Sequence, residues 1–174
     1  MTLPIPAFAR FIAGERVTAA KLNSQVVDSG NFFLTPPTAR LVQTTSQPLA
    51  ASTWTSVQFQ SEELDNYGGW STSAPTRYIA QVPGWYLVAA NVAFAANATG
   101  VRFMRLTRNG QLIPGRSNSQ AVNSTSFQTE LALAHLVRLE ATNFLEAQAF
   151  STVALSTSVT VEVASTLNVI WVAA

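Results

Sequence analysis

From residue 39 to the C-terminus, apolar and polar side chains alternate in short runs that are separated by Gly, Pro, Ser and Asn. Alternation with a period of two is typical of half-buried β-strands, and these separating residues favour turns. We expect strands at residues 39–44, 54–59, 77–81, 85–94, 102–108, 111–115, 127–138, 144–151 and 166–172. Many short strands with no helix between them predict an antiparallel β-sandwich or barrel.

Two turns link these runs with particular clarity. Asn109-Gly110 lies between two apolar runs, and this dipeptide is the strongest short-range signal of a β-hairpin. A second turn is expected at residues 141–143, before the run at 144–151. Both turns favour neighbouring strands that run antiparallel.

The strand at residues 85–94 is apolar on both of its faces. One face carries Tyr86, Val88, Ala90, Val92 and Phe94, and the other carries Trp85, Leu87, Ala89, Asn91 and Ala93. A strand of an antiparallel sandwich usually has one face in water. We therefore predict that the second face contacts another subunit; cover by an internal loop or by the N-terminal segment is the alternative.

Residues 1–38 have a different pattern and are predicted to form an N-terminal arm, with the β-domain at residues 39–174. Thr18 can cap a short helix that Gly30 ends, and Leu22 and Val26 lie four residues apart on one side of it. An isolated short helix is marginal in water. We expect the arm either to fold back on its own domain or to anchor the domain to another chain, through Phe8, Phe11, Leu22 and Val26.

Composition favours a protein that is partly covered by other chains. Hydrophobic residues make up 48% of the chain and charged residues only 11%, against about 25% in ordinary soluble domains. So few charges give little repulsion against self-association.

The net charge of +1 gives no electrostatic footprint for nucleic acid. The absence of cysteine excludes disulfides, thiolate zinc sites and cysteine nucleophiles.

Targeting signals are also missing from the sequence. Prolines interrupt the first residues, and no apolar run follows a basic start as in a signal peptide. No stretch approaches the ~18 apolar residues that span a membrane. We expect a protein that is made in a cytoplasm without a signal peptide and is not inserted in a membrane.

The residues that could carry chemistry fit structural roles better. His135, the single histidine, would have to be the base of any Ser-His-Asp triad, but it shares an apolar strand face; we predict a packed or interface histidine, no catalytic residue and no enzyme. No spaced ligand cluster accompanies it, so no metal or cofactor is predicted. Glu62, Glu63 and Asp65 could bind calcium from a loop, although a solvated loop is the commoner arrangement.

Arginines and tryptophans leave a ligand site open. Arg102, Arg105 and Arg108 lie near one strand of the predicted hairpin. They could contact a sugar, a lipid head group or a phosphate, but pairing with carboxylates across a subunit interface or facing solvent is the favoured interpretation. The tryptophans could stack on a glycan, but aromatic side chains of such sandwiches mostly serve the core or an interface; they are Trp54, Trp70, Trp85 and Trp171.

The motif RYIAQVPGWYLVAANVAF (residues 77–94) resembles the signature of the complement globular-head and tumour-necrosis-factor superfamily, with Pro83, Gly84 and Tyr86 at its turn. RFMRLTRNGQLI and HLVRLEATNFLEAQAF are similar to two further strand pairs of that family, although Thr142-Asn143 stands where the family usually has Gly-Asp. The resemblance implies an all-β, antiparallel ten-strand jelly roll and a homotrimer. Trp85, Leu87 and Ala89 would then lie at the trimer contact.

The segment FIAGERVTAAKLNSQVVD (residues 11–28) is similar to a leader of small tailed-phage virion proteins, many of which carry a jelly roll of this kind. Together the two resemblances imply a non-enzymatic structural component of a bacteriophage virion, a trimeric minor tail or fibre-type protein that docks on other virion proteins through its arm. A head decoration protein, and a carbohydrate-binding adhesin that recognises a host surface glycan, are the alternatives.

Overall fold

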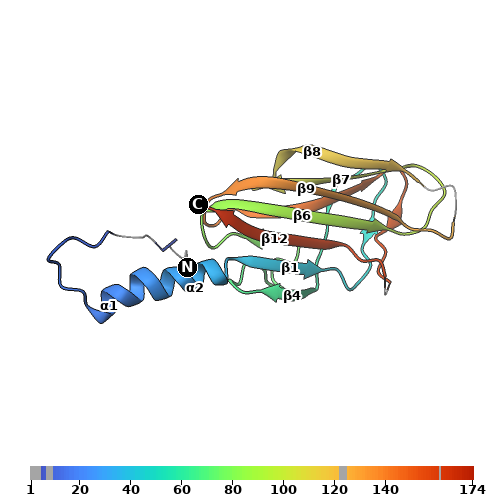
Figure 1. The fold of residues 1–174 in the computed structure, drawn as a ribbon. Coiled ribbons are helices and arrows are strands. Elements are labelled where there is room, and N and C mark those ends of the chain that lie inside the picture. The colour runs from blue at the N-terminus through green and yellow to red at the C-terminus, as the bar shows by residue number, and fades with distance from the viewer. Residues whose placement is uncertain (1–4, 7–9, 122–124, 161) are drawn as a thin grey trace.

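In the computed structural model the chain forms a jelly-roll β-sandwich, and a helical N-terminal segment extends from one end of it (Figure 1). The structure describes residues 5–6, 10–121, 125–160 and 162–174. The C-terminus lies at the end of the sandwich from which the helix extends (Figure 1). An arm of short helical character before an antiparallel sandwich agrees with the fold class expected from the sequence.

The strands form two main antiparallel sheets and one small one. The first sheet has the order β4–β1–β12–β6–β9, with β4 at Ser61–Asp65, β1 at Thr38–Val42, β12 at Thr166–Ala173, β6 at Gly84–Phe94 and β9 at Thr129–Leu139. The second has the order β3–β10–β7–β8, with β3 at Thr55–Ser56, β10 at Phe144–Ser151, β7 at Val101–Arg108 and β8 at Gln111–Gln120; β5 (Tyr78–Ile79) also pairs with β10. The small sheet joins β2 (Pro48–Leu49) to β11 (Leu155–Ser156).

The core lies between the two main sheets and is built by alternation. On β6 every second side chain from Tyr86 to Phe94 points inward and is buried, as the sequence predicts. Tyr86 keeps its hydroxyl satisfied inside the core, because Oη donates to the carbonyl of Val82 at 2.6 Å. Burial, partly offset by this hydrogen bond, raises the pKa of Tyr86 to about 12.

Two turns depend on backbone that most residues avoid. Gly84 has φ +150°, and a Cβ there would lie 2.2 Å from Nε1 of Trp171, whose indole donates to the carbonyl of Pro83 at 3.1 Å. Only glycine can therefore bring the start of β6 against Trp171. In the predicted hairpin, Asn109 and Gly110 both have positive φ, which is the geometry of a type I′ turn between β7 and β8.

The N-terminal helix begins where the sequence predicts and ends later. Thr18 caps it by accepting a hydrogen bond from the Lys21 amide at 3.2 Å. Helical turns then continue through α1 (Ala19–Leu22), the π-helical η1 (Asn23–Asp28) and α2 (Ser29–Leu34). The expectation that Gly30 ends the helix is wrong: Gly30 continues the helix, which ends before Pro36-Pro37, where proline restricts the preceding backbone.

Phe32 fixes this helix to the sandwich. Its ring is 5% exposed and meets Trp171 edge-on, with the ring centroids 4.9 Å apart, and Tyr67 at 6.4 Å. The last turn of the helix therefore packs on the core of the jelly roll, while the earlier turns extend away from it (Figure 1).

Several strand boundaries differ from those expected. Only Thr55–Ser56 and Tyr78–Ile79 are strands within the expected ranges 54–59 and 77–81, whereas β8 continues to Gln120. Residues 61–65, which include Glu62, Glu63 and Asp65, form β4 rather than the expected loop. This edge strand has no buried residue, so its sequence lacks the apolar alternation that identifies a half-buried strand.

Candidate interaction surface

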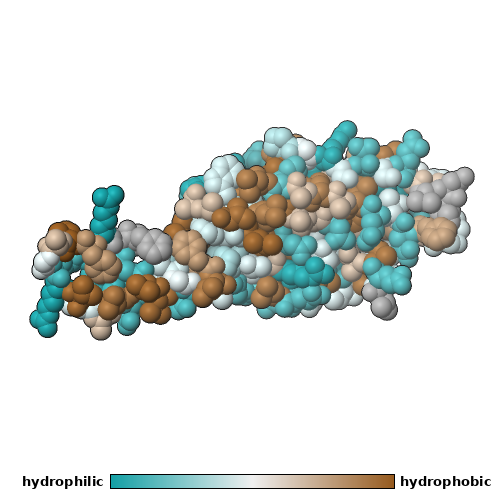
Figure 2. All heavy atoms as spheres, in the orientation of Figure 1, coloured by the Kyte–Doolittle hydropathy of each residue, from teal (hydrophilic) through white to brown (hydrophobic). Residues whose placement is uncertain are grey.

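The outward face of the first sheet carries a continuous band of apolar side chains at the end near the C-terminus. Leu87 of β6 lies directly opposite Ile170 of β12 on one side and Leu136 of β9 on the other. Cross-strand neighbours of this kind are about 4.5–5.5 Å apart and cover one another's flanks. Figure 2 shows hydrophobic side chains gathered over this part of the molecule. We call this surface the apolar half of the face: Trp85, Leu87, Ala89, Ala134, Leu136, Ile170 and Val172.

Its large side chains remain open to solvent in the single chain. Trp85, Leu87, Leu136, Ile170 and Val172 are between 39% and 60% exposed, and Ala89 is half-buried. A contiguous apolar patch of more than a few hundred Å² is rare on a monomeric soluble protein and marks a contact surface. The structure thus brings Trp85, Leu87 and Ala89 together on one outward face; their place in a trimer contact stays a prediction.

The partners of these three residues on β9 and β12 were missed by the sequence reasoning. Leu136 alternates with buried Val137, and Ile170 with buried Val169, so β9 and β12 repeat the two-sided apolar pattern of β6. That pattern was the signal available in the sequence. Read in all three strands, it would have indicated a band across the sheet.

The N-terminal segment presents a second apolar surface. Phe11, Leu22 and Val26 are all exposed, with the Lys21 ammonium 4.9 Å from the centre of the Phe11 ring. Phe8 lies outside the described residues. Val27, Phe33 and Leu34 add further exposed apolar area along the helix. No helix in the described ranges is both long and apolar enough to cross a membrane.

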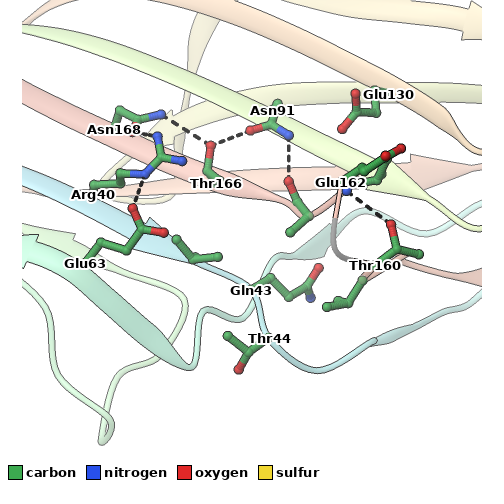
Figure 3. A pocket seen from close by; sticks show the side chains of 14 residues that line it. Arg40, Gln43, Thr44, Glu63, Asn91, Glu130, Thr160, Glu162, Thr166 and Asn168 are labelled. Carbon is green, nitrogen blue, oxygen red and sulfur yellow. Dashed lines mark hydrogen bonds and ion pairs between the residues drawn. The ribbon is translucent and has the colours of Figure 1, made fainter.

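The other half of the same sheet face is polar and hollowed, forming a pocket of about 620 Å³ (Figure 3). We call this surface the polar half: Arg40, Glu63, Asn91, Glu130, Glu162, Thr166 and Asn168. A row of hydrogen bonds crosses it. Arg40 Nε donates to Glu63 Oε2 at 2.5 Å and Arg40 Nη1 to Asn168 Oδ1 at 3.2 Å, and Asn168 Nδ2 donates to Thr166 Oγ1 at 3.3 Å.

This row continues to the far wall of the pocket. Thr166 Oγ1 donates to Asn91 Oδ1, and Asn91 Nδ2 donates to the carbonyl of Ala164 at 2.7 Å. Each of these side chains is therefore held in one orientation by its neighbour. Five strands (β1, β4, β6, β9 and β12) and the loop before β12 contribute to the pocket, so its residues are widely separated in the sequence.

The sequence candidates for metal and acid chemistry do not form a site. Glu63 pairs with Arg40, and Asp65 Oδ2 accepts a hydrogen bond from the Trp70 amide at 2.8 Å, whereas Glu62 is exposed. Within the described ranges, no group of acidic or histidine side chains is arranged to hold a metal ion. His135 is half-buried and packs against the backbone of Gly115 on β8, which agrees with a packed histidine.

The three arginines lie in different environments: Arg105 is over the Trp54 ring, and Arg108 is exposed and donates to the Arg138 carbonyl at 2.8 Å. Arg102 is fully buried on the inward face of β7, where its guanidinium donates to Ser151 Oγ at 3.2 Å and to the Asn97 carbonyl at 3.4 Å. Burial lowers the pKa of Arg102, and no carboxylate pairs with it in the described part of the chain. The expectation that it faces solvent or an interface carboxylate is wrong, because it follows the inward alternation of Met104 and Leu106.

The tryptophans do not assemble a sugar-stacking platform. Trp171 is in the core and Trp70 is half-buried, with its indole donating to the Pro75 carbonyl at 3.3 Å. The Arg105 guanidinium lies 3.9 Å from the centre of the Trp54 ring and occupies one of its faces. Trp85 belongs to the apolar half, and none of the four lines the polar pocket.

The fold is that of known jelly-roll domains. The globular domain of zebrafish complement 1qA aligns with a TM-score of 0.60 at 12% identity, covering 78% of this chain and 97% of that one. Murine APRIL aligns with TM-scores of 0.60 at pH 8.0 and 0.61 at pH 5.0, at 18% and 16% identity, covering 78% of this chain and 98% of its own. No family model and no curated protein matches the sequence.

The chain therefore has the jelly-roll fold of the complement 1qA globular domain and of APRIL. This confirms the fold that the motif at residues 77–94 implied. At these identities the likeness establishes the fold alone, and the phage-type leader remains a prediction.

Proposed function

We propose that this chain is a non-enzymatic structural protein of a tailed bacteriophage particle, and that it works as a homotrimer. The observation that carries the proposal is the apolar half of the sheet face, which a single chain leaves in water. Burying apolar area contributes about 25 cal/mol per Å², so self-association through this band offsets the cost of exposing it. The three-fold count comes from the resemblance of the chain to the complement-head family.

The arm supports a role in a larger particle. Phe32 ties the end of the helix to the jelly roll, and the exposed side chains of Phe11, Leu22 and Val26 lie further out on the extending segment. An apolar surface held away from its own domain is suited to contact with another protein. We propose that this segment docks the trimer on another virion protein, as a minor tail or fibre-type component.

Two measurements test these parts separately. Light scattering on the purified full chain should give the mass of three copies, and a stable monomer would contradict the trimer. Gold-labelled antibody on intact particles of the phage that encodes the chain should mark the tail. Label on the head would instead assign a decoration protein, and particles without label would contradict a virion role altogether.

Removal of the arm tests docking. Deletion of residues 1–28 spares Phe32 and its contact with Trp171, so the truncated chain should remain folded and trimeric but should no longer enter particles. The Phe32→Ala variant of the full chain is a matched control, since it loosens the helix from the domain without shortening it. Normal incorporation of the truncated chain would show that the arm is not the anchor.

A further inference from the structure

The floor of the polar pocket contains a buried amide without partners. Gln43 is 0% exposed, and neither its Oε1 nor its Nε2 has a hydrogen-bond partner within the described part of the chain. Its side chain lines the pocket (Figure 3). Buried polar atoms are almost always paired, and leaving them unpaired is costly. An occupant of the pocket that offers both a donor and an acceptor would satisfy the Gln43 amide.

Unpaired acceptors also stand at the rim. Glu130 at the start of β9 and Glu162 in the loop before β12 are exposed, and neither carboxylate forms a hydrogen bond or ion pair within the described ranges. Figure 3 shows both at the same side of the pocket, opposite the Arg40–Glu63 pair. Carboxylates at such a rim can accept hydrogen bonds from hydroxyl or ammonium groups.

We propose that this pocket binds a saccharide, namely a neutral or amino sugar unit. A sugar ring carries hydroxyl groups that both donate and accept, which satisfies the Gln43 amide and the rim carboxylates together. Three carboxylates (Glu63, Glu130 and Glu162) against one guanidinium (Arg40) disfavour anionic sugars and favour a ring with an ammonium group. The volume of about 620 Å³ is within the range of roughly 300–1,000 Å³ for small-molecule sites.

Protein contact explains the pocket less well. The buried centre of a protein interface is depleted of charged residues, whereas this pocket has charged side chains at both ends and an orphaned amide at its floor. The apolar half of the same face has the composition of a contact surface. One sheet face thus divides into a surface for a second copy and a surface for a small polar ligand.

The saccharide site goes beyond the proposed function and does not depend on it, because one chain supplies every lining residue. If the protein recognises a host glycan, the polar pocket would be the binding site, and none of the tryptophans lines it. Without an aromatic platform each site should be weak. If the chain is trimeric, three linked sites would raise the avidity for a repeating glycan.

The direct test is saturation-transfer NMR and calorimetry on the full chain with three matched sugars: glucosamine, glucose and glucuronate. We expect glucosamine to bind most tightly, glucose more weakly and glucuronate not at all. Equal response to all three, or no response to any, would overturn the proposal. So would binding that EDTA abolishes and calcium restores, since the contacts would then be made through a metal.

Variants locate the site. Gln43→Met should abolish binding of both sugars while raising the melting temperature, because it removes the unpaired amide at similar volume. Glu130→Gln and Glu162→Gln should each weaken glucosamine about tenfold or more, and glucose less. The control is Glu140→Gln, an exposed carboxylate just beyond the opposite end of β9, which should change neither.

Light scattering on the same samples separates this proposal from the trimer. A chain that binds glucosamine as a monomer would retain the saccharide site and contradict only the proposed assembly. If the wild-type trimer does not bind but the Leu87→Arg variant does as a monomer, the pocket is covered by the neighbouring copy and the saccharide proposal fails.

Discussion

The two halves of one sheet face differ in chemistry although the same strands build them. Near the C-terminus, β12, β6 and β9 direct Ile170, Leu87 and Leu136 outward; a few residues further along, Asn168 and Asn91 occupy the outward positions of β12 and β6. On the inward side β6 and β12 are apolar and buried along most of their length. The jelly roll itself therefore requires neither outward pattern.

This difference separates what the fold needs from what its contacts need. Packing of the core accounts for Tyr86, Val88 and Val169, but no internal packing accounts for Leu87 or for the unpaired amide of Gln43. Apolar residues in water and polar residues without partners both cost free energy. Contact of the apolar half with another protein, and of the polar pocket with a polar ligand, would offset both costs.

The largest expected effect distinguishes the two halves directly. Leu87→Arg places a charge between Ile170 and Leu136, where burial in the trimer contact would desolvate it. We expect the dissociation constant of the trimer to rise at least about a hundredfold, or roughly 3 kcal/mol. Light scattering over a range of concentrations measures this change.

Two matched variants define the limits of the contact. Ala132→Arg lies on the outward face of β9, opposite Asn91, and should leave the trimer intact. Leu112→Arg, on β8 of the other sheet, changes an exposed leucine outside the apolar half and should also have no effect. If Ala132→Arg dissociated the trimer, the contact would reach into the polar half. If the trimer stayed intact with Leu87→Arg, the apolar half would not be the contact surface.

The sequence predicted those features that one strand carries by itself. The alternation from Trp85 to Phe94 gave the core face and the outward apolar residues of β6, and Asn109-Gly110 gave the hairpin. It missed β4, because an exposed charged edge strand has no alternation. It also missed the polar pocket, because Gln43, Asn91, Glu130 and Glu162 are far apart in the chain and only the sheet order brings them together.

Alkaline titration tests the core beneath the apolar half, where Tyr86 is buried. Burial raises the pKa of Tyr86 from its ordinary value of 10 to about 12. Because the folded state favours the neutral phenol, this stabilisation is complete below pH 10 and is lost as the pH rises through 12. We expect the free energy of unfolding to fall by about 2–3 kcal/mol over this window, measured by urea unfolding at each pH.

Tyr86→Phe is the control for this titration. It should be less stable at pH 8, because it lacks the hydrogen bond to Val82, and its alkaline loss should be smaller. Some loss should remain, since burial also raises the pKa of Tyr78. If the free energy of unfolding of Tyr86→Phe fell as steeply with rising pH as that of the wild type, Tyr86 would not be the cause of the alkaline loss of stability.

Truncating adjacent side chains of β6 should affect two different properties, the stability of the domain and the association of the trimer. Val88 is 0% exposed on the inward face, so Val88→Ala should lower the free energy of unfolding by about 2 kcal/mol through lost burial and a cavity and leave the trimer formed. Leu87→Ala should instead weaken the trimer and cost the isolated domain less than about 1 kcal/mol. Urea unfolding at low and high protein concentration separates the two effects. If both variants showed the same concentration dependence, the two faces of β6 would not have separate roles.

The smallest effect is expected in the polar half. Glu63 and Arg40 form an ion pair whose side chains are 56% and 48% exposed, and exposed pairs contribute about 0–1 kcal/mol. Glu63→Gln should therefore change the free energy of unfolding by less than about 0.5 kcal/mol and leave the trimer unchanged. A loss of 2 kcal/mol or more in urea unfolding would mean that the row of hydrogen bonds from Arg40 to Asn91 is part of what holds the sheet together. A small change would mean that this row contributes little to the fold, as expected if it is there to hold the pocket side chains in position for a ligand.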